Sequence, residues 1–292
     1  MQPYIDEIET VDGLAARLGL HRAGREWRGA CPACGYRDSF VLSAGDNGRP
    51  LIWCAACQDR DAMVAILRGS EAPWTAPGPQ AEAKRRAAAE GAQRRAMRLW
   101  GESIPAAGTL ADRYLESRGL AGLAASPALR FRGDCWHKWT CSRLPALVAA
   151  VTNASGQVVA VHRTFLRRDG SGKANVEPQR ASLGPIRGGA VRLDPAAPEL
   201  VIGEGIESAA SAGRLLGLPA WAAISAGNLE RGLVLPPEVR RVVIAADNDP
   251  AGRDAAHATF FRWCAEGRQV EVALPDQDGC DFNDLLLRRS VP

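Results

Sequence analysis

The chain has no long apolar run and little net charge. No window in its 292 residues approaches the roughly 20 apolar residues that a membrane-spanning helix needs, and its start lacks the basic residues and apolar stretch of a secretory signal. These absences predict a cytoplasmic protein that makes no membrane contact. The formal net charge is only +3, so any nucleic-acid surface must come from local clusters of arginine rather than from bulk charge.

Half of the cysteines in the chain form two close pairs. Of eight cysteines, four lie in Cys31-Pro-Ala-Cys34 and Cys54-Ala-Ala-Cys57. Nineteen residues separate the two pairs, which matches the spacing of tetrahedral Zn²⁺ sites. Because a closed four-cysteine site leaves no open coordination position, we expect a structural zinc ion that organises a binding module.

The residues around these cysteines predict a zinc ribbon. Two strand-like runs and two helix-like segments accompany them, namely Ser39–Leu42, Pro50–Trp53, Ile5–Leu18 ending at Gly19, and Asp61–Arg68. Basic and aromatic residues are interleaved with the ribbon: Arg22, Arg25, Arg28, Arg37, Trp27, Tyr36 and Trp53. This mixture suits phosphate contact and base stacking on single strands, although aromatic side chains beside a small zinc core also serve as packing. Both roles stay open for the aromatic residues.

The amino-acid composition changes several times along the chain. Residues 69–80 are rich in Pro, Gly and Ala and predict a linker. Ala81–Trp100 predicts a basic helix, either a solvated connector or a nucleic-acid contact. Strand-like runs at Ala146–Thr152 and Gln157–Phe165 predict an α+β middle region. We therefore divide the chain into a zinc-binding domain (1–70), a linker with a basic helix (71–100), the α+β region (101–195) and a C-terminal domain (196–292).

The C-terminal domain alternates short apolar runs with helix-like segments. The runs are Leu200–Ile202, Ala220–Ile224, Val242–Ala246 and Gln269–Ala273. This alternation is typical of a parallel sheet flanked by helices. The fold class expected for the whole chain is therefore multidomain, α/β and α+β, with a zinc ribbon at its N-terminal end.

Carboxylates follow two of these runs. Glu204 and Gly205 come after the first, and Asp247 and Asp249 come after the third. Because the carboxyl ends of neighbouring parallel strands converge on one crevice, we expect the three acids to share a site. Mg²⁺ prefers such oxygens and keeps positions for substrate phosphates. The alternative is that each acid caps the helix that follows its strand.

At these residues the sequence resembles a known family. Glu204-Gly205, Asp247-Asn248-Asp249 and the later Gly279-Cys280-Asp281-Phe282-Asn283-Asp284 are similar to the three acidic motifs of Toprim domains. Toprim domains occur in DnaG-type primases, topoisomerases, OLD-family nucleases and RecR-type recombination proteins. With a zinc ribbon at the N-terminal end, the resemblance points to DnaG-like primases of phages and plasmids.

The resemblance implies roles for individual residues. Glu204 is expected as the catalytic carboxylate and Asp247 and Asp249 as the Mg²⁺ or Mn²⁺ ligands, with Asp281 as a further candidate. The chain departs from the family pattern at Ser208, where many bacterial primases carry Asp, and at Asn283, where a second Asp is frequent.

The activity that the resemblance implies is RNA primer synthesis on a single-stranded DNA template from ribonucleoside triphosphates. A cluster of cations ahead of the acidic motifs is available to hold phosphates. Its members are Arg163, Arg167, Arg168, Lys173 and Arg180, with Arg163 and Lys173 favoured as nucleotide contacts. A solvated loop is the alternative for this cluster. Two other functions also stay open: a non-catalytic RecR-like DNA-binding module and a Toprim nuclease.

One glycine-rich motif superficially resembles the P-loop of a helicase motor. Gly170-Ser171-Gly172-Lys173 lacks the first glycine and the Ser or Thr of a P-loop, because Arg167 and Ala174 stand at those positions. No helicase motor is therefore visible in this sequence, and we expect a replicative helicase to act in trans.

Overall fold

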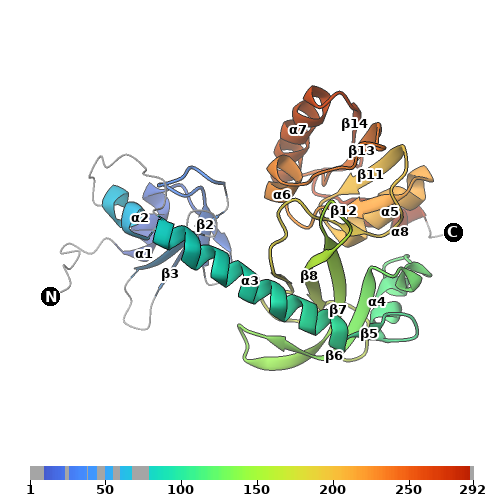
Figure 1. Cartoon of the computed structure of the whole chain (residues 1–292), viewed down its shortest axis with the longest axis horizontal. Coiled ribbons are helices and arrows are strands. Elements are labelled where there is room, and N and C mark those ends of the chain that lie inside the picture. Colours follow the sequence, from blue (N-terminus) through green and yellow to red (C-terminus); the bar gives the residue numbers. More distant parts are fainter. Residues whose placement is uncertain are drawn as a thin grey trace. The chain divides into compact units, whose positions relative to one another are not determined.

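The computed structural model describes residues 10–23, 26–37, 39–44, 50–54, 60–67 and 79–289. The chain forms two compact units, Met1–Arg86 and Ala87–Pro292, and each is described by itself (Figure 1). Among the described residues, no helix has both the length and the apolar character required to cross a bilayer.

The first unit is a four-stranded antiparallel sheet with two short helices. Its elements are α1 (Val11–Arg17), β1 (His21–Ala23), β2 (Glu26–Gly29), β3 (Phe40–Ala44), β4 (Pro50–Cys54) and α2 (Arg60–Leu67), with the strands in sequence order. Thr10 caps α1, and Gly19 follows it with φ of +62°, which only glycine adopts readily. Leu14, Phe40 and Met63 are buried together with two of the cysteines. The two predicted strands are confirmed, and the predicted helix before Gly19 is confirmed over Val11–Arg17, while residues 5–9 of that prediction lie outside the described residues. Strands β1 and β2 were not predicted.

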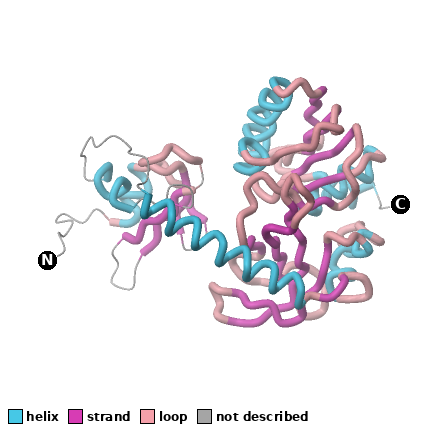
Figure 2. Tube along the Cα trace, in the orientation of Figure 1, coloured by secondary structure: helices cyan, strands magenta, loops and turns pink. Residues whose placement is uncertain are grey.

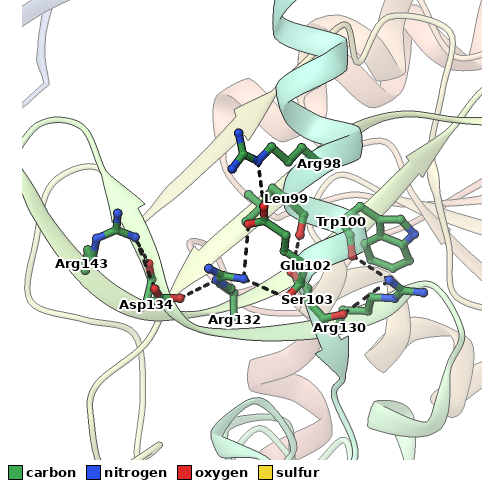
Figure 3. A network of polar contacts seen from close by, with 9 residues as sticks. All are labelled: Arg98, Leu99, Trp100, Glu102, Ser103, Arg130, Arg132, Asp134 and Arg143. Atoms are coloured by element: carbon green, nitrogen blue, oxygen red, sulfur yellow. Dashed lines mark hydrogen bonds and ion pairs between the residues drawn. The ribbon is translucent and has the colours of Figure 1, made fainter.

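A long helix, α3 (Pro79–Glu102), includes all of Ala81–Trp100, which was predicted to be a basic helix. Its C-terminal end is held by arginines of a neighbouring strand (Figure 3). Arg130 donates to the Trp100 carbonyl at 2.7 Å, and Arg132 donates to the Glu102 carbonyl at 2.9 Å. Because the last carbonyls of a helix have no partner within the helix, these donors anchor α3 where it ends.

The middle of the chain forms a second antiparallel sheet in the order β5-β6-β7-β8-β9. Its strands and helices are β5 (Ile104–Pro105), α4 (Leu110–Ser117), a 3₁₀ turn (Leu123–Ala125), β6 (Leu129–His137), β7 (Ser142–Thr152), β8 (Val158–Phe165) and β9 (Arg180–Leu183). Side chains alternate along the central strand β7: Val148 packs with Ala96 of α3, and Leu147 packs with Tyr114 and Leu115 of α4. Both faces of this sheet are therefore covered.

The third sheet has the order β10-β12-β11-β13-β14. Figure 2 shows its strands in magenta with helices in cyan beside them. Its elements are β10 (Val191–Arg192), β11 (Glu199–Gly203), α5 (Ile206–Leu216), β12 (Ala220–Ala222), α6 (Ala226–Arg231), β13 (Arg241–Ala245), α7 (Pro250–Ala265), β14 (Gln269–Ala273) and α8 (Phe282–Arg289). The four predicted strands run parallel, as expected, and β10 adds an antiparallel edge beside β12.

The second and third sheets share one core. Tyr114, Leu147 and Val151 of the middle region pack in a single cluster with Ile206 and Ala209 of α5. The region 101–195 and the C-terminal sheet therefore lie within one compact unit. This shared packing brings residues that are distant in sequence to the carboxyl edge of the third sheet.

Candidate metal and nucleotide site

Glu204 and Asp247 lie at the same edge of the third sheet. Strands β11 and β13 are parallel neighbours, and Gly203 opposite Ala245 is the last residue pair between them. Both acids come just after this end of the two strands. Burial raises the pKa of Glu204, and the nearby charges of Asp247 and Asp249 raise it further. The acids that the sequence predicted to converge therefore influence one another's ionisation.

Asp247 has a specific hydrogen-bond partner. The Ser208 hydroxyl lies 2.9 Å from Asp247 Oδ1 and donates to it from the first turns of α5. Burial raises the pKa of Asp247, the Ser208 hydrogen bond lowers it, and the charges of Asp281 and Asp249 raise it. The serine that departs from the family pattern thus supports the charged form of a neighbouring carboxylate.

Two of the acids do act as helix caps. Asp249 Oδ1 accepts from the Gly252 amide at 2.7 Å at the start of α7, and Asp281 Oδ1 accepts from the Asp284 amide at 2.9 Å at the start of α8. A side chain at Gly252 would lie 2.3 Å from the Asp247 carbonyl oxygen, so this turn requires glycine. The capping alternative therefore holds for one oxygen of Asp249 and one of Asp281.

The carboxylates do not form a compact metal cage. Among the described residues, no three acidic side chains bring ligand oxygens within 4.8 Å of one another. Mg²⁺ is commonly held by one or two carboxylates plus water and substrate phosphates, and this arrangement suits such a site. The donor set of Glu204 and Asp247 fits a hard divalent cation.

Two asparagines position the acidic loops. Buried Asn248 donates to the Pro275 carbonyl at 2.8 Å, and its backbone amide donates to the Cys280 carbonyl at 3.0 Å. These bonds tie the Asp247 loop to the loop that carries Asp281. Asn283 is fully buried and donates to the Arg118 carbonyl at 2.7 Å. Asn283 therefore holds α8 in place instead of facing the acids.

Four cations of the cluster predicted to bind phosphates have different surroundings in the structure. Arg163 donates to the carbonyls of Ala181, Ser182 and Trp136 at 3.2 to 3.4 Å, so its guanidinium supports the backbone. Lys173 Nζ lies 3.4 Å from Oε1 of buried Glu207. Arg167 and Arg168 are exposed in the turn after β8.

Arg180 is the cation that reaches the acids, and the sequence analysis placed it in the cationic cluster without selecting it as a nucleotide contact. It begins β9, is exposed, and places a guanidinium nitrogen 3.5 Å from the position of a Cβ at Gly205. Its positive charge lowers the pKa of both Glu204 and Asp247, against the larger effect of burial. Only the tertiary structure, which brings the first residue of β9 next to Gly205, distinguishes Arg180 from the other arginines of this segment.

His162 lies among the same charges. Its ring is half-buried on β8, and Nδ1 lies 3.0 Å from the Ser182 hydroxyl. Burial and the positive charge of Arg180 lower the pKa of His162 to about 4. The imidazole is therefore neutral at physiological pH.

Three of the four predicted zinc ligands lie together in the first unit. The sulfurs of Cys31, Cys34 and Cys54 are within 4.8 Å of one another, and those of Cys34 and Cys54 are 3.8 Å apart. Sulfurs bound to one tetrahedral Zn²⁺ at about 2.3 Å lie roughly 3.8 Å apart, so the spacing fits this ion. The fourth predicted ligand, Cys57, lies outside the described residues.

The surroundings of the sulfurs also fit a structural zinc site. Ser39 Oγ lies 3.2 Å from Cys54 Sγ, and the amides of Ala33 and Cys34 donate to Cys31 Sγ. A hydrogen bond with the Cys54 thiol, together with burial, raises the pKa of Cys31, so a cation is needed to stabilise thiolates here. The triad is consistent with structural zinc.

Comparison with solved structures finds several that are similar to this chain at low identity. The chain is similar to the Aquifex aeolicus primase (zinc-binding and RNA polymerase domains) at 16% identity and a TM-score of 0.47, over 97% of this chain and 80% of that chain. It is similar to the primase fragment of the bacteriophage T7 primase-helicase protein at 14% identity and a TM-score of 0.44, over 91% and 96%. The RNA polymerase domain of Mycobacterium tuberculosis primase DnaG gives 20% identity and a TM-score of 0.43, over 70% and 80%.

No curated protein matches the chain. Residues 90–193 match a domain of unknown function, DUF7146. Residues 199–291 match the Toprim domain model, which confirms the predicted Toprim fold for the C-terminal part of the chain.

Proposed function

We propose that this protein is a DNA primase, which synthesises short RNA primers on single-stranded DNA by metal-dependent nucleotidyl transfer. The observation that carries the proposal is the meeting of Glu204, Asp247 and the Arg180 guanidinium at the carboxyl edge of a Toprim sheet. Carboxylates with an exposed cation beside them form a site for a metal-bound triphosphate. The N-terminal cysteine triad favours a primase over a Toprim domain of another class.

Each residue of the site has a proposed task. Glu204 and Asp247 would hold Mg²⁺ or Mn²⁺, which when bound promotes attack by a 3′-hydroxyl and stabilises the departing pyrophosphate. Ser208 favours the ionised form of Asp247, and Asn248 ties the Asp281 loop to the Asp247 loop. Arg180 contacts the triphosphate and neutralises part of its charge. Asp249 and Asp281 contribute negative charge while one oxygen of each caps a helix.

The zinc ribbon is proposed to contact the template, with Cys57 as the fourth zinc ligand. Trp53 and Leu51 of the edge strand β4 are 52% and 54% exposed, and Trp53 is opposite Val41, which is opposite Arg28. An aromatic side chain and a cation on one face of a sheet suit base stacking and phosphate contact. The helicase that would unwind the template is proposed to act in trans.

The test is primer synthesis. The protein is incubated with single-stranded DNA, labelled ribonucleoside triphosphates and Mg²⁺, and wild type is compared with Asp247→Ala and with Asp276→Ala, an exposed acid of the loop after β14. Short labelled RNA from wild type and Asp276→Ala but not from Asp247→Ala supports the proposal. DNA cleavage would support a nuclease instead, and binding without synthesis would support a RecR-like module.

A further inference from the structure

Strands β6 and β7 extend past the sheet to which they belong. The last residue of β8, Phe165, is opposite Ala146. Beyond that point β6 and β7 continue to pair with each other, with Trp136 opposite Arg143 and His137 opposite Ser142. We name residues 135–144 the β6–β7 arm, a two-stranded hairpin that projects from the middle sheet (Figure 1).

The tip of the arm is held by a buried histidine. His137 is fully buried, its ring packs edge-on against Phe165 at 4.6 Å, and its Nε2 lies 3.1 Å from the Pro178 carbonyl oxygen. Because a carbonyl only accepts, Nε2 carries the proton and Nδ1 accepts from the Thr140 amide at 3.2 Å. Cys141 closes the turn at φ of +48°, a conformation that costs energy for a residue with a side chain. The tip therefore has a defined shape.

The base of the arm is braced by ion pairs (Figure 3). Asp134 lies 2.5 Å from Arg132 and 3.4 Å from Arg143, and Arg132 reaches Glu102 of α3 at 3.4 Å. Arg163 of β8 donates to the Trp136 carbonyl of the arm. These contacts join the arm to α3 and to the middle sheet, so its exposed side chains are presented on a fixed support.

The side chains presented are aromatic and basic. Trp136 is 47% exposed and Trp139 is 50% exposed. Lys138 lies between them and is exposed, and the Arg143 side chain across the hairpin is 62% exposed. Folding normally buries indole rings, because each contributes a large apolar area. Here a strained turn and a buried histidine hold two half-exposed indoles beside two cations. Trp139 also contacts the His137 ring, with the ring centroids 5.5 Å apart, and Arg143 pairs with Asp134.

We propose that the β6–β7 arm binds single-stranded DNA, with Trp136 and Trp139 stacking on bases and with Lys138 and Arg143 contacting phosphates. Unpaired bases offer faces to aromatic rings without regard to sequence, and adjacent cations match the charge of the backbone. A protein partner would have to bury these cations against acids of its own. The inference rests on the proposed function only in taking single-stranded DNA as the ligand.

The test measures the affinity of the full chain for a labelled oligodeoxythymidine by fluorescence anisotropy at one fixed salt concentration. Trp136→Ala and Trp139→Ala should each weaken binding about 5-fold or more, whereas Trp136→Phe should restore most of the affinity because phenylalanine also stacks. Phe261→Ala is the matched control, since Phe261 is an exposed aromatic residue (58%) on α7, and should bind as wild type. Circular dichroism confirms that each variant is folded.

Wild-type affinity in folded Trp136→Ala and Trp139→Ala would overturn the proposal, and would leave the arm as a surface for another partner. An equal loss in Phe261→Ala would also overturn it, because the effect would not belong to the arm. Primer synthesis separates this result from the proposed function. Asp247→Ala should lose synthesis and keep DNA affinity, so failure of the polymerase proposal is recognised independently of the arm.

Discussion

Lys173 Nζ lies 3.4 Å from Oε1 of Glu207, and the same carboxylate oxygen accepts a hydrogen bond from the Tyr114 hydroxyl. Burial alone would raise the pKa of Glu207, but the charge of Lys173 and the Tyr114 hydrogen bond outweigh it and hold the pKa at about 2. This buried contact joins the loop after β8, α4 and α5. It also accounts for the position of Lys173, which the sequence analysis favoured as a nucleotide contact.

Replacing Glu207 should change how stability depends on pH. The pKa of Glu207 is about 2 in the folded protein and about 4.3 in an unfolded chain. Its charge therefore stabilises the fold above the unfolded value, and this contribution is lost as the pH falls toward 2. Glu207→Gln should lower the free energy of unfolding by roughly 3 kcal/mol at pH 7 and by much less near pH 2.

Urea denaturation between pH 7 and pH 2.5 measures this effect. Glu116→Gln, an exposed carboxylate on α4, serves as the control and should follow wild type. Stability curves of Glu207→Gln and wild type that stay parallel over the whole range would contradict the assignment.

Ser208→Ala should shift the pH dependence of primer synthesis. The hydroxyl stabilises the charged form of Asp247, so its removal raises the pKa of that carboxylate further. More of Asp247 is then protonated at a given low pH, and the acid limb of the rate profile should move up by about one pH unit. Activity measured from pH 5 to 9 tests this expectation, with Ser117→Ala on α4 as a control. An unmoved acid limb would remove Ser208 from the site.

Arg180 and Arg163 should fail in different ways when replaced. Arg180→Ala removes an exposed cation next to the acids and should raise KM for nucleotides about 10-fold with little loss of stability. Arg163→Ala removes three hydrogen bonds to backbone carbonyls and should cost about 2 kcal/mol of stability. Steady-state kinetics and urea denaturation on both variants measure the contrast. A reversal of the two phenotypes would return Arg163 to the nucleotide site.

The cysteine triad predicts a metal-dependent first unit. Cys54→Ser should lose bound zinc and the fold of the first unit, because structural zinc supplies much of the stability of such small modules. Cys264→Ser, an exposed cysteine of α7, should retain the metal. Zinc released by a thiol-blocking reagent and quantified with a chromogenic chelator measures both. Equal zinc in the two variants would argue against the site.

Much of the fold could be read from local patterns. The parallel strands were predicted because each is a short apolar run between helix-like segments, and burial on both faces of such a sheet demands that composition. The strands β1 and β2 of the ribbon were missed, since three or four polar and apolar residues such as Glu26–Gly29 carry too little periodicity. The edge strand β10 was missed for the same reason.

Within the site, the sequence by itself determined which acids follow buried strands, because Glu204 and Asp247 stand next to apolar runs whose carboxyl ends must converge. It also determined the cysteine pairs, whose spacing is a local property of the turn. The tertiary structure alone decided the partners: Ser208 on Asp247, Lys173 on Glu207, and Arg180 rather than Arg163 beside the acids. These choices depend on how β9, α4 and α5 pack together. Long flexible cations reach partners that are distant in sequence, and no periodicity encodes that distance.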